Sequence, residues 1–355
     1  MKVLKLAAVA AATSVLGLSS AYAAEFTLRI QTHYSPEQTS GKLATQFVDD
    51  VETMSGGRID IELFYSSSVV KSVEGFDAAA SGILDGDMTG GAYQTGKNPA
   101  FQFVGDIMGG YDTPWQQYAW LYYGGGYEEA NKLYNQYGMQ LIGWWIFGQE
   151  SLSSSTPIAG PADLKDWKFR SPPGMETEIF ASLGAKPIVM DFAEVPTALE
   201  TKIIEGTDYS TIGNNVSIGL YDIVNHATYP GFHSMPSDHV TIRKDVWDSL
   251  PPDLQRIIEV ATQKLAFQTA LAGEAQSNKY AAELRAKGVK LYNWSAEDRA
   301  EGLGREVPGG EVPGQQPYRL HEDPGPDAIA IVPPTATPRA PQAVPGGARN
   351  CERLC

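Results

Sequence analysis

Apolar and polar positions alternate over residues 26–31, which is the pattern of a strand with one buried face. The apolar spacing then changes to three and four residues, where Leu43, Phe47 and Val51 mark one face of a helix. In order, the first ninety residues predict a strand over 26–31, a helix over 37–53, a strand over 58–65, a helix capped by Ser72 and an extended piece over 86–90. This order indicates an α/β domain with a largely parallel sheet.

The middle of the chain repeats the alternation of strand and helix patterns. In order, it predicts a strand over 139–147, a turn over 163–165, a strand over 167–170, a helix over 176–183, a strand over 186–190, a helix over 195–204 and an extended piece over 207–212. Gly184 and Gly206 follow the two helices, a common place for a residue without a Cβ atom. A second α/β unit therefore follows the first.

The longest helical pattern begins at Pro251 and runs to about Lys287, with Leu254 and Ile258 among the apolar residues of one face. At 1.5 Å per residue this helix is roughly 50 Å long, which exceeds the width of one small domain. We therefore expect it to brace both units. Gly288 ends the helix, and residues 289–292 return as a strand.

The N-terminus has the pattern of a secretory signal peptide. Lys2 and Lys5 precede an apolar run from Leu6 to Leu18, and small residues ending in Ala21-Tyr22-Ala23 follow. The apolar run is too short to span a bilayer, which takes roughly 18 or more residues. We expect residues 1–23 to be removed and the mature protein to lie outside the cytoplasm.

The C-terminal segment 302–355 differs in composition from the rest of the chain. It holds 10 prolines and 8 glycines, and its apolar residues show no period. Such a segment cannot bury enough apolar surface to fold, so we expect it to be disordered. Cys351 and Cys355, the two cysteines of the chain, both lie in it, so the body offers no thiol for catalysis or metal binding.

The chain is acidic, with a formal net charge of −15 that becomes −17 once Lys2 and Lys5 are removed. This charge argues against nucleic acid as a partner. The sequence also lacks the Gly-x-Ser-x-Gly and His-Glu-x-x-His motifs and the full Gly-x-x-x-x-Gly-Lys-Ser/Thr motif of common enzymes. An acidic protein that binds an acid needs a local cation, so single Arg and Lys positions become informative.

Arg170 is the most informative of these positions. It ends the predicted strand 167–170 and precedes the turn Ser171–Gly174, which opens a helix. Ligands of open α/β sheets bind at strand ends, where a guanidinium can hold a carboxylate through two parallel hydrogen bonds. The alternative is an arginine paired with a surface carboxylate, and the strand position by itself leaves both open.

Two further strand ends carry polar groups. Gln149 and Glu150 follow the strand over 139–147, and Asp208 and Tyr209 lie in the extended piece over 207–212. Oxygen atoms of Gln149 and Asp208 would suit a hard cation, although an aspartate in this position more often caps a turn. His226, His233 and His239 lack the spacing of a zinc site.

Several motifs in order resemble the DctP family of TRAP (tripartite ATP-independent periplasmic) transporter binding proteins, and within it the branch for 2-oxo and hydroxy acids. The resemblance covers about residues 26–299. The motifs that carry it are Glu74–Ala78, Gly96–Gln102, Asp163–Arg170, Ala198–Glu200, Tyr229–Phe232 and Leu250–Pro252.

The resemblance implies an α/β fold of two domains, a type II-like periplasmic-binding-protein clamp with a long shared helix. The expected division is 1–23 signal peptide, 24–147 plus about 236–300 domain I with the bracing helix, 148–235 domain II, and 302–355 tail. It further implies a small carboxylate ligand, TRAP membrane subunits as partners, no catalysis and no cofactor.

For the site, the resemblance implies that Arg170 pairs with the substrate carboxylate and that Tyr93 and Phe232 wall the pocket. In the 2-oxo acid branch a sodium or calcium ion bridges substrate and protein. Its ligands here would be the side chains of Gln149 and Asp208 and the backbone carbonyl of Tyr209. The branch commonly has Glu-Trp where this chain has Asp208-Tyr209, and a tryptophan where it has Phe232.

The resemblance also bears on assembly. Similar proteins continue with further helices after the equivalent of Ala300, and some form a homodimer through such a helix. Here the Pro- and Gly-rich tail stands in that place, and a frameshift or truncation of the coding sequence is our hypothesis for it. Two rival functions stay open: an exported enzyme that uses Asp208, His226 or His233, and a binding protein that serves a sensor or another class of transporter.

Overall fold

The structure is a computed structural model that describes residues 24–302, all within one compact unit of the chain. Its first sheet has five strands in the order β2-β1-β3-β10-β4. These strands are β1 (Phe26–Thr32), β2 (Ile59–Phe64), β3 (Gly86–Met88), β4 (Met139–Trp145) and β10 (Asp238–Arg243). β1 runs parallel to β2 and β3, whereas β10 is antiparallel to both of its neighbours. The predicted largely parallel sheet is therefore mixed, because β10 returns to it from the second sheet.

Helices pack around this first sheet. They are α1 (Thr39–Met54), α2 (Gly75–Ser81), α3 (Phe101–Gly105), α4 (Pro114–Tyr123), α5 (Gly126–Asn135) and α10 (Lys244–Ser249), with short 3₁₀ helices at Ser72–Glu74 and Gly91–Gln94. The apolar face of α1, including Ala44, Phe47 and Val51, is buried as its spacing predicts. Thr113 caps α4 by accepting from the backbone N–H of Gln116, and Pro114 occupies its first turn.

The second sheet has six strands in the order β11-β9-β5-β8-β6-β7. Its strands are β5 (Leu152–Ser154), β6 (Lys168–Ser171), β7 (Lys186–Val189), β8 (Gly206–Asp208), β9 (His226–Thr228) and β11 (Lys290–Tyr292). Its helices are α6 (Met175–Ser182), α7 (Val195–Glu200), α8 (Ile212–Ser217), α9 (Leu220–Ile223) and α12 (Ala296–Gly302), with 3₁₀ helices at Pro161–Leu164 and Phe192–Glu194. β6 lies between β7 and β8, so two non-consecutive strand ends become neighbours.

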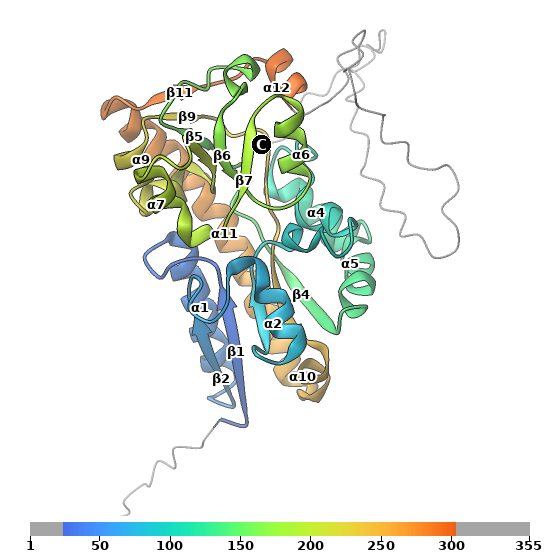
Figure 1. The fold of residues 1–355 in the computed structure, drawn as a ribbon. Coiled ribbons are helices and arrows are strands. Elements are labelled where there is room, and N and C mark those ends of the chain that lie inside the picture. The colour runs from blue at the N-terminus through green and yellow to red at the C-terminus, as the bar shows by residue number, and fades with distance from the viewer. Residues whose placement is uncertain (1–23, 303–355) are drawn as a thin grey trace, which may run out of the picture. The chain divides into compact units, whose positions relative to one another are not determined.

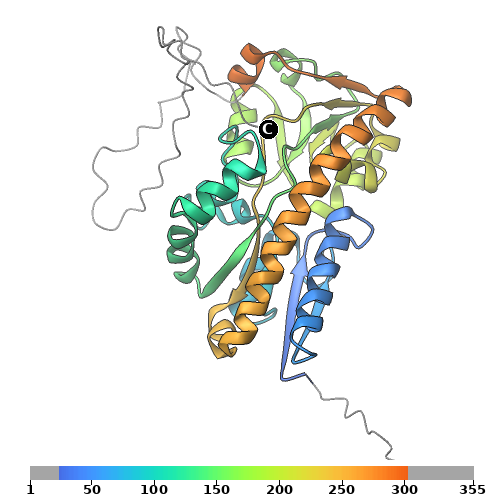
Figure 2. The ribbon, with the colours of Figure 1, turned by 180° about the vertical axis from the view of Figure 1, so that it is seen from behind.

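Helix α11 (Pro252–Ala286) spans both sheets, as predicted. It contacts α1 and β4 of the first half and α8 and β11 of the second. Figure 2 shows it in orange, crossing the described part of the chain from one sheet to the other. A Cβ atom on Gly273 would overlap the carbonyl of Phe147, so the chain that leaves β4 passes directly against the helix at this glycine.

One cluster of buried apolar residues joins the two halves. It includes Leu28 and Phe47 near the first sheet and Phe192, Leu199 and Tyr209 near the second. In Figure 1 the first sheet lies below the second, with α11 behind both. The halves therefore meet in a closed arrangement.

Several predicted elements are confirmed with small shifts, and others are wrong. The helix expected over 195–204 ends at Glu200, and the piece expected over 207–212 is a strand only to Asp208, before α8 begins. Ser72 does not cap α2, because its hydroxyl donates to Asp191 across the two halves. A tertiary partner thus replaces the local cap.

The predicted signal peptide 1–23 and the tail from 303 onward, with Cys351 and Cys355, lie outside the described residues. Among residues 24–302, no helix is both long and apolar enough to cross a membrane. The domain boundaries stay a prediction, although β11 pairs with β9 and so places residues 290–292 in the second sheet.

Candidate ligand-binding site

Arg170 lies near the end of β6 and is 2% exposed. Its Nη1 donates a hydrogen bond of 2.8 Å to the carbonyl oxygen of Asp208, and its guanidinium lies 5.6 Å from the ring centre of Phe192. Among the described residues, Nε and Nη2 have no hydrogen-bond partner. These two nitrogens form the edge that binds a carboxylate in a bidentate manner. Since an unpaired buried donor is costly, the arrangement calls for an anionic acceptor at this edge.

The neighbours of Arg170 keep it charged. Burial by itself disfavours the charged form, but Tyr93 and Asp208 outweigh burial and raise the pKa of the guanidinium above its ordinary value. Among the described residues, Arg170 is the only lysine or arginine in the buried set. The interior therefore offers one fixed positive charge.

Aromatic rings from both halves surround this charge. Tyr93, in the 3₁₀ helix Gly91–Gln94 of the first half, lies with its ring centre 5.9 Å from that of His33. Tyr209 of the second half stacks on Phe192 at 3.8 Å between ring centres. Burial raises the pKa of both tyrosine hydroxyls, so each phenol stays neutral and can donate a hydrogen bond.

Asp208 ends β8 and is fully buried. Its Oδ1 lies 3.2 Å from Nε2 of His233, and a carboxylate oxygen of Glu176 completes a group of three ligand-type atoms within 4.8 Å of one another. Glu176 lies in the first turn of α6, directly after the turn that follows Arg170. Three separate elements of the second half thus bring their side chains together.

The ionisation of this group follows from its burial. Burial raises the pKa of Glu150 and Glu176 well above the usual range, and the nearby charge of Asp208 raises it further. Burial opposes ionisation of Asp208 as well, but His233 and the two glutamates outweigh it and lower its pKa. Of these three carboxyl groups, Asp208 therefore loses its proton most readily.

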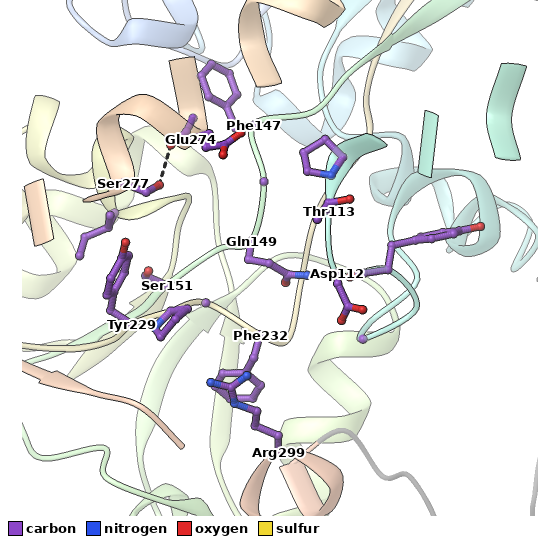
Figure 3. A pocket seen from close by; sticks show the side chains of 18 of the residues that line it. Asp112, Thr113, Phe147, Gln149, Ser151, Tyr229, Phe232, Glu274, Ser277 and Arg299 are labelled. Carbon is purple, nitrogen blue, oxygen red and sulfur yellow. Dashed lines mark hydrogen bonds between the residues drawn. The ribbon is translucent and has the colours of Figure 1, made fainter. Parts of the chain in front are cut away.

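Two of the predicted site residues, Gln149 and Phe232, line a cavity. This cavity of about 870 Å³ lies beside α11 and α12, as Figure 3 shows, and its lining does not include Arg170, Tyr93, Asp208 or Tyr209. The Nε2 of Gln149 donates to the carbonyl of Tyr111 at 2.7 Å, and Phe232 packs on Trp294 at 4.8 Å between ring centres. Their roles in binding stay a prediction.

The oxygens expected to hold a hard cation are chemically suited to one. Oε1 of Gln149 and both carboxylate oxygens of Asp208 are buried without a hydrogen-bond partner among the described residues. Oxygen ligands of this kind are those that sodium and calcium take, and a bound cation would offset the charge of Asp208 beside the ligand.

Sequence reasoning missed several residues of the site. Glu176 and Phe192 were not singled out. Phe192 is far from Arg170 along the chain, and nothing in the sequence indicates that the two meet. A signal for Glu176 existed in part: it falls in the first turn of the helix that follows the Arg170 strand, so it was bound to lie near that strand end.

Two α/β sheets joined by a shared helix and closed over a buried guanidinium define a clamp-type solute-binding protein. Residues 30–302 match the profile of bacterial extracellular solute-binding protein family 7 (DctP), and the chain belongs to this family. The family and the two-domain clamp fold predicted from the motifs are thereby confirmed.

Relatives of known structure or function support this assignment. The chain is 33% identical to a TRAP periplasmic solute-binding protein of Rhodobacter sphaeroides in an apo open structure, with a TM-score of 0.59 over 78% of this chain and 89% of that one. It is 26% identical to one of Pseudoalteromonas atlantica with bound sodium and pyruvate, with a TM-score of 0.72 over 79% and 86%. It is 28% identical to a monocarboxylate 2-oxoacid-binding periplasmic protein of Nostoc sp. over 70% of this chain and 68% of that protein.

Proposed function

We propose that this chain is the periplasmic binding subunit of a TRAP transporter and captures a small organic acid, a 2-oxo or hydroxy monocarboxylate. The observation that carries the proposal is the free edge of Arg170, whose buried Nε and Nη2 lack partners among the described residues. A carboxylate there satisfies both donors and neutralises the guanidinium. The relatives that bind pyruvate or 2-oxo acids support this class of ligand.

The charge around the site favours one carboxylate over two. Arg170 is the only buried arginine or lysine in the described part of the chain, whereas Asp106, Glu150 and Asp208 are buried acids nearby. A second carboxylate on the ligand would meet these acids, and the guanidinium edge of Arg170 can pair with one carboxylate only. The neutral hydroxyls of Tyr93 and Tyr209 instead suit an oxo or hydroxyl oxygen.

The proposed mechanism is binding without chemistry. The acid enters the open clamp, Arg170 takes its carboxylate, the halves close, and the closed form is recognised by the TRAP membrane subunits. A sodium or calcium ion held by Gln149, Asp208 and the carbonyl of Tyr209 belongs to this proposal, as do the periplasmic location and a homodimer.

Calorimetry on Arg170 variants tests the assignment. Arg170→Ala leaves a desolvated carboxylate unpaired, a loss of about 3 to 5 kcal/mol, so binding of pyruvate or lactate should weaken at least about 100-fold. Arg170→Lys should not restore it, because an ammonium lacks the two-donor edge. Arg58→Ala is the control, since Arg58 lies on the surface beside Glu25 and Asp253.

Unchanged affinity in Arg170→Ala would remove Arg170 as the anchor. Tighter binding of succinate than of pyruvate and lactate by the unmodified chain would contradict the monocarboxylate class. Turnover of any of these acids would revive the enzyme alternative.

A further inference from the structure

We propose that His33 is a specificity-determining residue of the clamp. Its Nδ1 accepts a hydrogen bond from the hydroxyl at C2 of the bound acid, and the protein thereby selects 2-hydroxy acids over acids without that group. This inference deepens the proposed function and rests on it, because it concerns the same ligand that Arg170 holds by its carboxylate.

The position of His33 in the fold matches that of Arg170. His33 directly follows β1 and is 4% exposed. β1 lies inside the first sheet, between β2 and β3, and ligands of α/β sheets bind at the carboxyl ends of such strands. Arg170 lies near the end of β6, inside the second sheet. Each half of the clamp thus brings one buried nitrogen-bearing side chain to a strand end.

The ring of His33 also shares its neighbours with Arg170. It stacks on Phe192 of the second half, with 4.9 Å between the ring centres and 17° between the ring planes. The guanidinium of Arg170 lies 5.6 Å from the centre of the same Phe192 ring. Tyr93, which raises the pKa of Arg170, has its ring centre 5.9 Å from that of His33. A short acid whose carboxylate pairs with Arg170 can therefore extend its C2 substituent toward His33.

The two ring nitrogens of His33 have different surroundings. Nε2 faces Oδ2 of Asp238 at 3.5 Å, and the same oxygen accepts a hydrogen bond of 2.7 Å from the hydroxyl of Tyr34. An electron pair on Nε2 would face this carboxylate, so the proton of the neutral ring belongs on Nε2, and Nδ1 is then the acceptor. Nδ1 is buried and makes no hydrogen bond within residues 24–302. Buried polar atoms are almost always satisfied, so Nδ1 calls for a donor.

A hydroxyl at C2 is the donor that fits this nitrogen. It can donate its hydrogen to Nδ1 while its oxygen coordinates a cation, so the contact is compatible with the sodium or calcium ion of the proposed function. An oxo oxygen only accepts and would face the electron pair of Nδ1. A site that hydrogen-bonds a hydroxyl discriminates against an analogue that lacks it. The alternative is a water molecule on Nδ1, which would give no such discrimination.

Calorimetry with three acids that share a carboxylate tests the role of His33. The acids are lactate, pyruvate and propionate, which differ only at C2. In His33→Phe, which keeps a ring to stack on Phe192, lactate should lose about ten-fold in affinity, whereas propionate and pyruvate should change less than about three-fold. Equal losses for lactate and propionate would overturn the proposal. A loss for pyruvate as large as that for lactate would show that Nδ1 donates and would also overturn it.

Two polar variants decide the question if His33→Phe does not fold. The amide of an asparagine stands close to the former position of Nδ1, and that of a glutamine close to the former position of Nε2. His33→Asn should therefore keep most of the preference for lactate over propionate, and His33→Gln should lose it. The reverse order would place the contact at Nε2 and overturn the proposal. His226→Phe is the matched control, because His226 is a half-buried histidine of β9 that pairs with Tyr292, and all three affinities should stay within about two-fold.

This proposal and the assignment of Arg170 fail in different ways. All three acids carry the carboxylate, so loss of the Arg170 contact weakens all of them together. The contact of His33 changes only the ratio of lactate to propionate affinity. In the unmodified chain, lactate that binds no more tightly than propionate would therefore overturn the role of His33 and leave the carboxylate anchor intact.

Discussion

Closure of the clamp should depend on one carboxylate, Asp191. It lies at the start of the 3₁₀ helix Phe192–Glu194 in the second half and is 5% exposed. Its Oδ1 accepts from Oγ of Ser67 at 2.6 Å, and its Oδ2 accepts from the backbone N–H and the Oγ of Ser72, both at 2.7 Å. The three donors all belong to the first half, so these hydrogen bonds exist only while the halves are together.

The change Asp191→Asn keeps the shape of the side chain but replaces one acceptor oxygen with an NH₂ group. The Asn cannot accept at both positions, so at least one backbone N–H, of Ser72 or Ala193, loses its partner or its charge-assisted bond. Such bonds contribute about 1.5–3 kcal/mol each, so we expect closure to weaken by roughly 2–3 kcal/mol. That corresponds to a factor of about 30 to 150 in the ratio of closed to open forms.

Small-angle scattering measures this ratio through the radius of gyration, with and without a bound acid, and calorimetry measures the affinity. Asp191→Asn should be more open and bind more weakly, because only the closed form completes the site. Lys71→Ala is the matched control. Lys71 also reaches across the halves, to Glu194 at 3.4 Å, but both side chains are more than half exposed, so less than about a two-fold effect is expected.

The pH dependence follows from the same contacts. Burial opposes the charge of Asp191, but the hydrogen bonds from Ser67 and Ser72 outweigh it and lower its pKa. A lowered pKa in the closed form means that the stabilisation is complete above the ordinary pKa of an aspartate, about 4, and is lost as the pH falls through the lowered value. If Asp191→Asn scatters and binds as the unmodified chain does at pH 7, this account of closure is wrong.

Two further predictions concern stability. Gly273→Ala should destabilise the protein by about 1–3 kcal/mol in urea unfolding, because the added Cβ atom meets the carbonyl of Phe147, and an unchanged midpoint would contradict this packing. Burial raises the pKa of Asp106 to about 6, so the native state holds a proton that the unfolded state releases near pH 4. Its contribution to stability should therefore decline as the pH rises from about 4 to 6, and Asp106→Asn should flatten the pH profile in that window; a profile that stays unchanged in Asp106→Asn would show that another group titrates.

Much of the fold was accessible from local patterns. Strands β1, β2, β4, β6 and β7 and helices α1, α6 and α11 lie close to their expected positions, because each has a clear apolar period or a glycine at its end. The antiparallel strand β10 and its place between β3 and β4 were not predicted, since strand order depends on pairings between distant segments.

The pair Gln149 and Glu150 shows where local reasoning stops. The sequence placed both at a strand end and favoured Gln149 for the site. In the structure Gln149 faces the large cavity, whereas Glu150 lies beside Ser234 and Asp208. Consecutive residues of an extended segment point to opposite sides, and only the packing of the whole chain decides which side holds the site.

The sequence by itself determined that this is an acidic α/β protein of two units with a long shared helix, and that Arg170 stands at a strand end. These properties depend on spacing and residue type along short stretches. The tertiary structure alone decided that Arg170 is buried with a free edge, and that Glu176, Asp208 and His233 meet. The reason is that β6 and β8 are neighbours in the sheet although they are distant in the chain. Burial of the side chains at their ends then determines which of these side chains are charged and which lack a hydrogen-bond partner.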